Sequence, residues 1–132
     1  MSVFIDTNVF VAYCNIRDIN HKRAVKLMKK IEDGMFGEAY ISDYVFDEIV
    51  TVAMLRTSLE KAMEIGEFLL NSDIEMLKVN DDVFNEAWEI FKEAKMSFTD
   101  CTIAATVKLF GIEHLASFDK GFRKFEWVRV IQ

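Results

Sequence analysis

The chain contains no proline, only five glycines and two cysteines in 132 residues. Without linker-like or low-complexity segments, we expect a single domain spanning residues 1–132. The two cysteines, Cys14 and Cys101, provide no disulfide framework, and with His21 and His114 they match no zinc-finger spacing. No apolar run approaches the roughly 18 residues that cross a membrane, and the first residues lack the basic stretch of a signal peptide. These absences predict a cytoplasmic protein without a membrane partner.

The charge of the chain argues against one broad class of nucleic-acid binder. Sixteen basic and 22 acidic residues give a net charge of −6, which argues against a protein that coats nucleic acids but not against an enzyme that cuts them. The basic residues are unevenly placed, with Lys22 and Arg23 in one group and Lys120, Arg123 and Lys124 in another. These groups are either solvated surface or local contacts for phosphates.

Short apolar segments alternate with amphipathic ones along the chain, which indicates strands alternating with helices. We expect Thr7 or Asn8 to cap the first helix and Gly111 to end the last one. Such alternation implies right-handed crossovers, and therefore an α/β sandwich with a mostly parallel sheet covered by helices. The predicted strands are 3–5, 39–41, 74–79, 114–118 and 127–131, and the predicted helices are 9–14, 21–32, 43–56, 58–70, 80–94 and 97–110.

Two acids follow predicted strands. Asp6 comes directly after residues 3–5, and Asp119 comes directly after 114–118. In an open parallel sheet, ligands bind outside the carboxyl ends of the strands, so both acids are expected at the functional edge. The alternative is that each one simply forms a turn, because aspartate favours such positions.

Two further acids are expected on the apolar faces of helices. Glu48 shares a helix face with Val45 and Val52, although an ion pair with a basic residue could explain it. Asp100 lies three residues after Ser97, which is the spacing of a capping box, yet its helical neighbours are apolar. Four acids brought to one edge would repel one another unless a cation joined them, and Mg²⁺ suits an all-oxygen cluster.

The ordered set of motifs resembles the PIN-domain ribonucleases, in particular the VapC-type toxins of toxin–antitoxin pairs. The resemblance covers essentially the whole chain. Its matching segments are Phe4-Ile5-Asp6-Thr7-Asn8, Glu48 in the third helical segment, Ser97-Phe98-Thr99-Asp100-Cys101 and Ser117-Phe118-Asp119.

The resemblance implies a PIN-like three-layer sandwich with a central sheet of about five strands and an endoribonuclease activity that depends on one or two Mg²⁺ or Mn²⁺ ions. Asp6, Asp100 and Asp119 would be metal ligands, and Glu48 would be a ligand or would hold metal-bound water. Thr7, Asn8, Ser97 and Thr99 would support them, and the basic residues Lys22, Arg23, Lys120, Arg123 and Lys124 would contact RNA. The expected partners are RNA, a small antitoxin protein and a second copy of the chain.

Some alternatives stay open. Many such relatives carry a further acid just after the Asp119 position, where this chain has Lys120-Gly121-Phe122, so a second metal site would be weaker. A catalytically weak PIN-like RNA-binding scaffold or an RNA-maturation factor would share the same fold. A phospho-receiver domain is disfavoured because Thr7 follows Asp6, where such a domain has a second acid. Asn8 similarly disfavours a phosphatase of the haloacid-dehalogenase type, which needs Asp-x-Asp.

Overall fold

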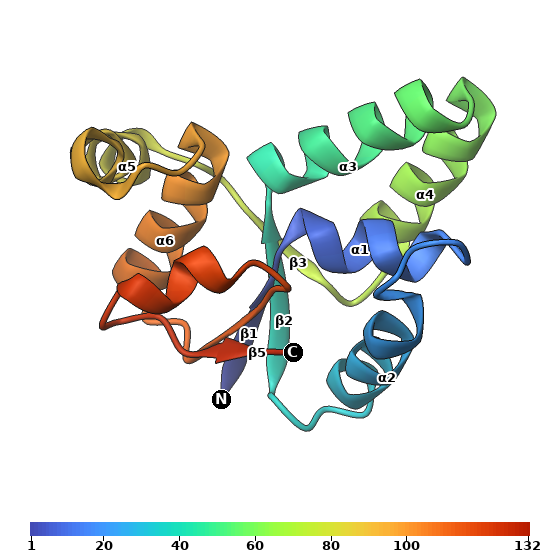
Figure 1. Ribbon diagram of the computed structural model, residues 1–132, viewed down its shortest axis with the longest axis horizontal. Helices are drawn as coiled ribbons and strands as arrows, with labels where there is room; N and C mark the ends of the chain where they lie inside the picture. Colours follow the sequence, from blue (N-terminus) through green and yellow to red (C-terminus); the bar gives the residue numbers. More distant parts are fainter.

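Five parallel strands form the centre of the protein, as seen in a computed structural model that describes all residues 1–132 (Figure 1). Every pair of neighbouring strands is parallel, so the predicted α/β class and sheet are confirmed, and no strand is antiparallel. In the order β3-β2-β1-β4-β5, the strands are β1 Ser2–Ile5, β2 Glu38–Ser42, β3 Glu75–Leu77, β4 His114–Ala116 and β5 Val130–Ile131.

Helices cover both faces of the sheet and complete a three-layer sandwich. In Figure 1, α5 and α6 lie to the left of the sheet, and α1 to α4 lie to its right. None of the helices is long and apolar enough to span a membrane. The helices are α1 Thr7–Cys14, α2 His21–Glu32, α3 Asp43–Arg56, α4 Leu59–Asn71, α5 Asp81–Ala94 and α6 Phe98–Phe110, followed by the 3₁₀ helix η1 Lys120–Lys124.

The core is built on β1 and α6. Val3, Phe4 and Ile5 are fully buried, as expected for a central parallel strand that is covered on both faces. All residues from Cys101 to Val107 are buried as well, so α6 is enclosed on every side. Its two buried threonines donate their hydroxyls to backbone carbonyls of the same helix, which satisfies their polar groups.

The helix boundaries follow capping chemistry at most positions. Ser42 and Ser97 each accept a hydrogen bond from a backbone N–H in the first turn of the following helix. Gly111 ends α6 in the left-handed conformation, as predicted. The predicted cap at Thr7 or Asn8 is wrong, because α1 begins at Thr7 and Asp6 occupies the cap position. The Asp6 carboxylate is directed instead to the Ser117 hydroxyl, just beyond β4.

The last strand is shorter than predicted. Only residues 130–131 pair with β4, because the preceding residues form a turn held by a bond from the Val128 N–H to the Phe125 carbonyl. The Trp127 indole N–H donates to the Ala104 carbonyl of α6 at 2.9 Å and draws this segment away from the sheet. Strands β3 and β4 are also shorter than expected, and η1 forms in a segment for which no helix was predicted.

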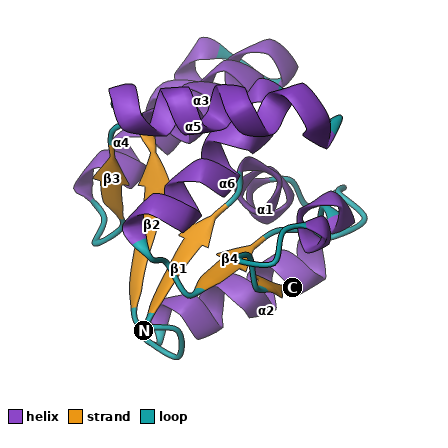
Figure 2. Ribbon diagram, turned by 90° about the vertical axis from the view of Figure 1, so that its left-hand side faces the viewer, coloured by secondary structure: helices purple, strands orange, loops and turns teal.

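The strand order creates a topological switch point at the centre of the sheet. β2 and β3 extend from one side of β1, and β4 and β5 extend from the other side. The chain therefore reverses its winding between β1 and β4, and such a switch point is where open α/β sheets bind ligands. Figure 2 shows β1 and β2 rising toward the helices at the top, so their carboxyl ends meet there.

Candidate functional site

The four predicted acids come from elements that meet at this carboxyl edge. Asp6 follows central strand β1, and its N–H donates to Ala116 of neighbouring β4 at 3.0 Å. Asp119 lies three residues after β4, and Glu48 lies on α3, which starts directly after β2. Asp100 is in the first turn of α6. The fold thus brings together residues that are more than 110 positions apart in the sequence.

Asp6 is the most buried member of the group, with 4% of its surface exposed. Burial raises its pKa from 3.8 to about 7, and the charges of Asp100 and Glu48 push it in the same direction. A hydrogen bond from Ser117 opposes them by favouring the ionised form. These influences show that Asp6, Asp100 and Glu48 lie within electrostatic reach of one another.

Ser117 is an organising side chain that was not among the residues predicted for the site. Its fully buried hydroxyl donates to Asp6 Oδ2 at 2.8 Å and accepts from the Asp119 N–H at 3.0 Å. Asn8 Nδ2 also donates to this hydroxyl at 3.4 Å, and Asn8 Oδ1 accepts from the Phe118 N–H at 3.2 Å. The sequence marked Ser117 only as part of the Ser117-Phe118-Asp119 segment, because its contact with Asp6 exists only in the folded chain.

Asp100 combines a structural and an electrostatic role. Ser97 caps α6 by accepting from the Asp100 N–H at 3.1 Å, so the predicted cap forms. The half-buried carboxylate has a raised pKa, mainly because of burial and then because of the charges of Asp119 and Glu48. A hydrogen bond from Ser97 partly offsets this increase. Each of the four acids therefore raises the pKa of another member of the group or has its own pKa raised by one.

Asp119 also has a local structural role. Its Oδ1 accepts from the Gly121 N–H at 2.8 Å and caps η1, so the predicted turn-forming role is real. A side chain at Gly121 would come within 3.0 Å of this same oxygen. The Asp119 backbone is therefore fixed by its N–H bond to the Ser117 hydroxyl, and its carboxylate is fixed by the Gly121 N–H at the start of η1.

No basic side chain neutralises the four acids. The ion pairs of the protein lie elsewhere and join Lys29 to Asp33, Lys61 to Glu64, Lys92 to Glu89 and Lys108 to Glu86. Asp100 and Glu48 raise the pKa of Asp6, and Asp119 and Glu48 raise that of Asp100, so this all-carboxylate group has the donor chemistry that suits a hard divalent cation. The side chains do not form a preassembled metal site, because no three His, Cys, Asp or Glu residues could hold an ion as they stand.

The supporting residues differ in how far they engage the acids. Asn8 and Ser97 join the network described above. The Thr7 hydroxyl is buried beside Asp6 without a hydrogen-bond partner, which is costly unless another group completes the site. The backbone carbonyl of Thr99 accepts a hydrogen bond from the Thr102 hydroxyl inside α6, at 2.6 Å.

Two of the five candidate basic residues contact the surroundings of the acids. The Arg23 guanidinium lies 4.8 Å from the ring centre of Phe118, the residue between Ser117 and Asp119. Lys124 donates to the Ala94 carbonyl, at the end of α5 just before the α6 turn. The other three, Lys22, Lys120 and Arg123, are exposed and belong to none of the ion pairs.

Comparison with known proteins gives a consistent result. The chain is 27% identical to the ribonuclease VapC6 of Methanocaldococcus jannaschii, over 99% of this chain and 97% of that protein. It is 25% identical to a VapC ribonuclease of Archaeoglobus fulgidus, over 92% and 80% of the two chains. Both alignments extend over nearly the whole chain, so the likeness is not confined to one motif.

Solved structures share the fold. The VapC20 toxin of Mycobacterium tuberculosis, which cleaves the sarcin–ricin loop, superposes with a TM-score of 0.81 at 23% identity, covering 92% of this chain and 93% of its own. The FitAcB structure from Neisseria gonorrhoeae gives 0.74 at 21% identity, covering 98% and 96%. The family model for the PIN domain matches residues 3–128. The predicted resemblance is thus confirmed, and the chain belongs to the PIN domain family.

Proposed function

We propose that this protein is a metal-dependent endoribonuclease that hydrolyses RNA phosphodiester bonds at the four-carboxylate group, and that it acts as the toxin of a toxin–antitoxin pair. The observation that carries the proposal is the gathering of Asp6, Glu48, Asp100 and Asp119 at the switch point without a basic partner. The relatives named VapC ribonucleases support the same activity.

Asp6, Asp100 and Asp119 would hold Mg²⁺, or Mn²⁺ in its place, and Glu48 would bind the ion or water on it. Such an ion supplies Lewis acidity and activates water for attack on a phosphodiester. One or two ions could be held. The donor set fits because its oxygens are otherwise repelled by one another, so a cation that replaces this repulsion by attraction is favoured.

The residues of the chain would prepare the site in three ways. Ser117 orients Asp6 and fixes the backbone of Asp119, which sets the distance between two ligand-bearing segments. Its hydrogen bond also favours the ionised form of Asp6, the form that binds a cation. Arg23, stacked over Phe118, places a positive charge beside the acids where a phosphate would lie.

The test is cleavage of a panel of structured and single-stranded RNAs with Mg²⁺ or Mn²⁺, alongside EDTA and Asp100→Asn controls. Loss of one essential electrostatic group typically lowers a rate by about 10² to 10³, so the variant should be nearly inactive. Binding without cleavage would favour the RNA-binding scaffold. Cleavage confined to a precursor RNA would favour a maturation role, and cleavage that survives EDTA would contradict the proposal.

An antitoxin would have a suitable surface in a groove between α1, α3 and α4. This groove has a volume of about 360 Å³ and an apolar floor that includes Phe10, Ile49 and Ile65. Arg56 and Lys61 are among its polar lining. The combination suits a protein segment that carries apolar and acidic residues, and solved toxin–antitoxin complexes share this fold.

Two experiments address the partners. If a small antitoxin is encoded next to the gene for this chain, its co-purification with the chain should be lost in an Arg56→Glu/Lys61→Glu variant, while RNA cleavage should persist. Retention of the complex would remove the groove from consideration. Sedimentation of the purified chain would test the expected homodimer, and a monomer at all concentrations would contradict it.

A further inference from the structure

A strip of exposed aromatic side chains runs along α5 beside the four acids. The aromatic strip consists of Phe84, Trp88 and Phe91 on α5 and Phe98 at the start of α6. The first three are 45%, 50% and 39% exposed, which is unusual for large aromatic residues of a small domain. Trp88 and Phe91 are stacked, with ring centres 5.7 Å apart and planes 21° apart.

The strip is connected to the acidic group through Phe98. This ring lies 5.2 Å from Phe84 and 5.9 Å from Phe91, measured between ring centres. Phe98 is also the first residue of α6, two positions before Asp100. The aromatic rings therefore form a continuous path from the turn that carries Asp100 to the outer surface of α5.

Most acids of α5 lie on the flank opposite the strip, and the exception is Asp81, which lies three positions before Phe84 at the start of the helix. With 3.6 residues per turn, Phe84, Trp88 and Phe91 share one flank of the helix. Glu86 and Glu89 face the other flank, where they pair with Lys108 and Lys92 at 2.7 and 3.0 Å. The acids on that opposite flank are Asp82, Glu86, Glu89 and Glu93.

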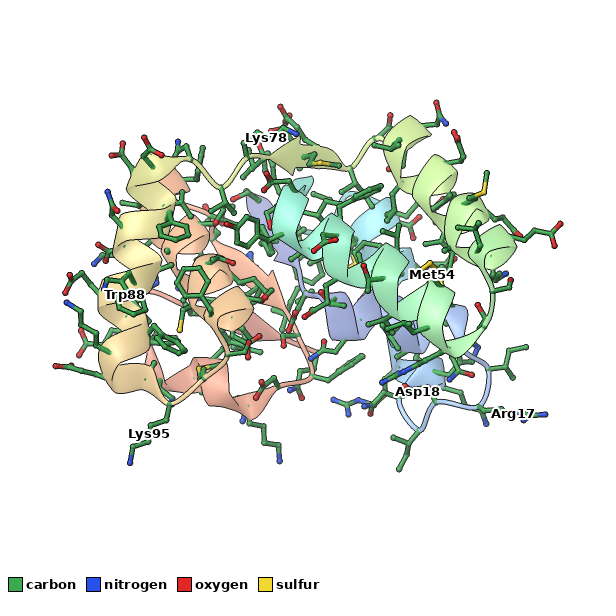
Figure 3. All side chains as sticks on the ribbon, turned by 90° about the horizontal axis from the view of Figure 1, so that it is seen from above. Arg17, Asp18, Met54, Lys78, Trp88 and Lys95 are labelled. Carbon is green, nitrogen blue, oxygen red and sulfur yellow. The ribbon has the colours of Figure 1, made fainter.

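Positive charge stands where the strip reaches the α5–α6 turn. Lys95 continues the spacing of the strip and ends α5 in a left-handed conformation, with φ of 54°. Figure 3 shows Trp88 and Lys95 on the same side of the molecule, with Lys95 extending outward. Lys124 approaches the same corner by donating to the Ala94 carbonyl. Aromatic rings can stack on bases, and the neighbouring lysines can contact phosphates.

A second exposed apolar face of the protein has a different character. It lies at the far end of α3 and on α4, and it includes Met54, Leu55, Leu59 and Met63, which are 44% to 76% exposed. Figure 3 places Met54 on the opposite side of the molecule from Trp88. Aliphatic side chains offer no flat rings for stacking, so this second face suits a protein partner, whereas the strip suits unpaired bases.

We infer that the aromatic strip is a base-stacking subsite for single-stranded RNA flanking the cleaved bond, with Lys95 and Lys124 contacting the adjoining phosphates. This inference rests on the proposed function. Stacking is available to every base, so the strip would contribute affinity and a preference for unpaired RNA instead of a sequence code. Its substrates would be loops or single strands, because bases inside a duplex cannot reach the rings.

The experiment measures binding of a fluorescent single-stranded RNA of mixed sequence to the Asp100→Asn protein, which should bind RNA without cutting it. In this background, Trp88→Leu keeps an apolar side chain but removes the ring, and Trp88→Phe restores a ring. Phe68→Leu on α4 is the matched control, because Phe68 is 57% exposed and lies outside the strip. Circular dichroism establishes that each variant is folded.

Trp88→Leu should weaken RNA binding by about 5- to 150-fold, which corresponds to the usual contribution of one base stack. Trp88→Phe should recover most of the affinity, Phe68→Leu should change nothing, and tryptophan fluorescence should be quenched on binding only when Trp88 is present. Equal affinities of Trp88→Leu and Phe68→Leu, with cleavage by the wild type intact, would overturn the inference but leave the proposed function standing.

Sedimentation of the same variants separates RNA binding from self-association. If Trp88→Leu converts a dimer to a monomer that binds RNA with unchanged affinity, the strip is an interface between copies and the inference is overturned. If the wild type neither cleaves nor binds any RNA, the proposed function fails, and the inference falls with it.

Discussion

Replacing Asp6 by asparagine should stabilise the metal-free protein at high pH while abolishing the proposed RNA cleavage. Burial and neighbouring carboxylates raise the pKa of Asp6 from 3.8 to about 7, which corresponds to a penalty of roughly 4 kcal/mol for the ionised carboxylate in the folded state. Because the folded-state pKa is the higher one, this penalty is absent below about pH 4. The penalty grows as the pH rises toward 7, and it reaches its full size above about pH 7. The asparagine side chain cannot ionise, so the variant avoids this penalty.

The assay is urea unfolding of wild type and Asp6→Asn in EDTA at pH 4 and pH 8. The difference in free energy of unfolding should be near zero at pH 4 and should approach roughly 4 kcal/mol in favour of the variant at pH 8. Asp73→Asn, at an exposed position, is the control and should show no such trend. Mg²⁺ at pH 8 should stabilise only the wild type. A difference that is the same at both pH values would refute the reasoning.

Three other substitutions test separate parts of the site. Ser117→Ala removes the hydroxyl that favours ionised Asp6, so the pH at which cleavage reaches half its maximum should move upward, and an unchanged pH–rate profile would count against this role. Gly121→Ala places a carbon 3.0 Å from Asp119 Oδ1, so Mn²⁺ affinity should fall by about 10-fold or more in calorimetry while the thermal melt stays cooperative. Unchanged affinity would show that Asp119 is free to move or does not bind the ion. Arg23→Gln removes the cation beside Phe118, so the salt dependence of RNA affinity should decrease by about 0.7 in log–log slope, and an identical slope would exclude a phosphate contact.

The positions of the strands and helices could be predicted only in part from the sequence. Buried runs such as Val3-Phe4-Ile5 mark central parallel strands, and polar caps such as Ser42 and Ser97 mark the starts of helices, so both were predictable. The structure at the end of the chain was not predictable. Trp127 is a residue type common in strands, but here its indole N–H donates a hydrogen bond to α6. Tertiary contacts of this kind override local propensity.

The site shows the same division between local and long-range information. The acids could be selected because each follows a strand or interrupts an apolar helix face. The role of Ser117 could not be derived in this way, because its hydroxyl links Asp6 and Asp119 across 111 and two positions of sequence, respectively. Likewise, the contact of Arg23 with Phe118 exists only once α2 and the segment after β4 are placed side by side.

The most direct measurement is a calorimetric titration of Mn²⁺ into the wild-type protein and the Asp100→Asn variant. Binding of one or two ions to the wild type, with affinity reduced at least 10-fold in the variant, is the result expected if the four carboxylates hold the metal. Equal binding by both proteins, or no binding by a folded wild type, would contradict a metal site formed by Asp6, Glu48, Asp100 and Asp119.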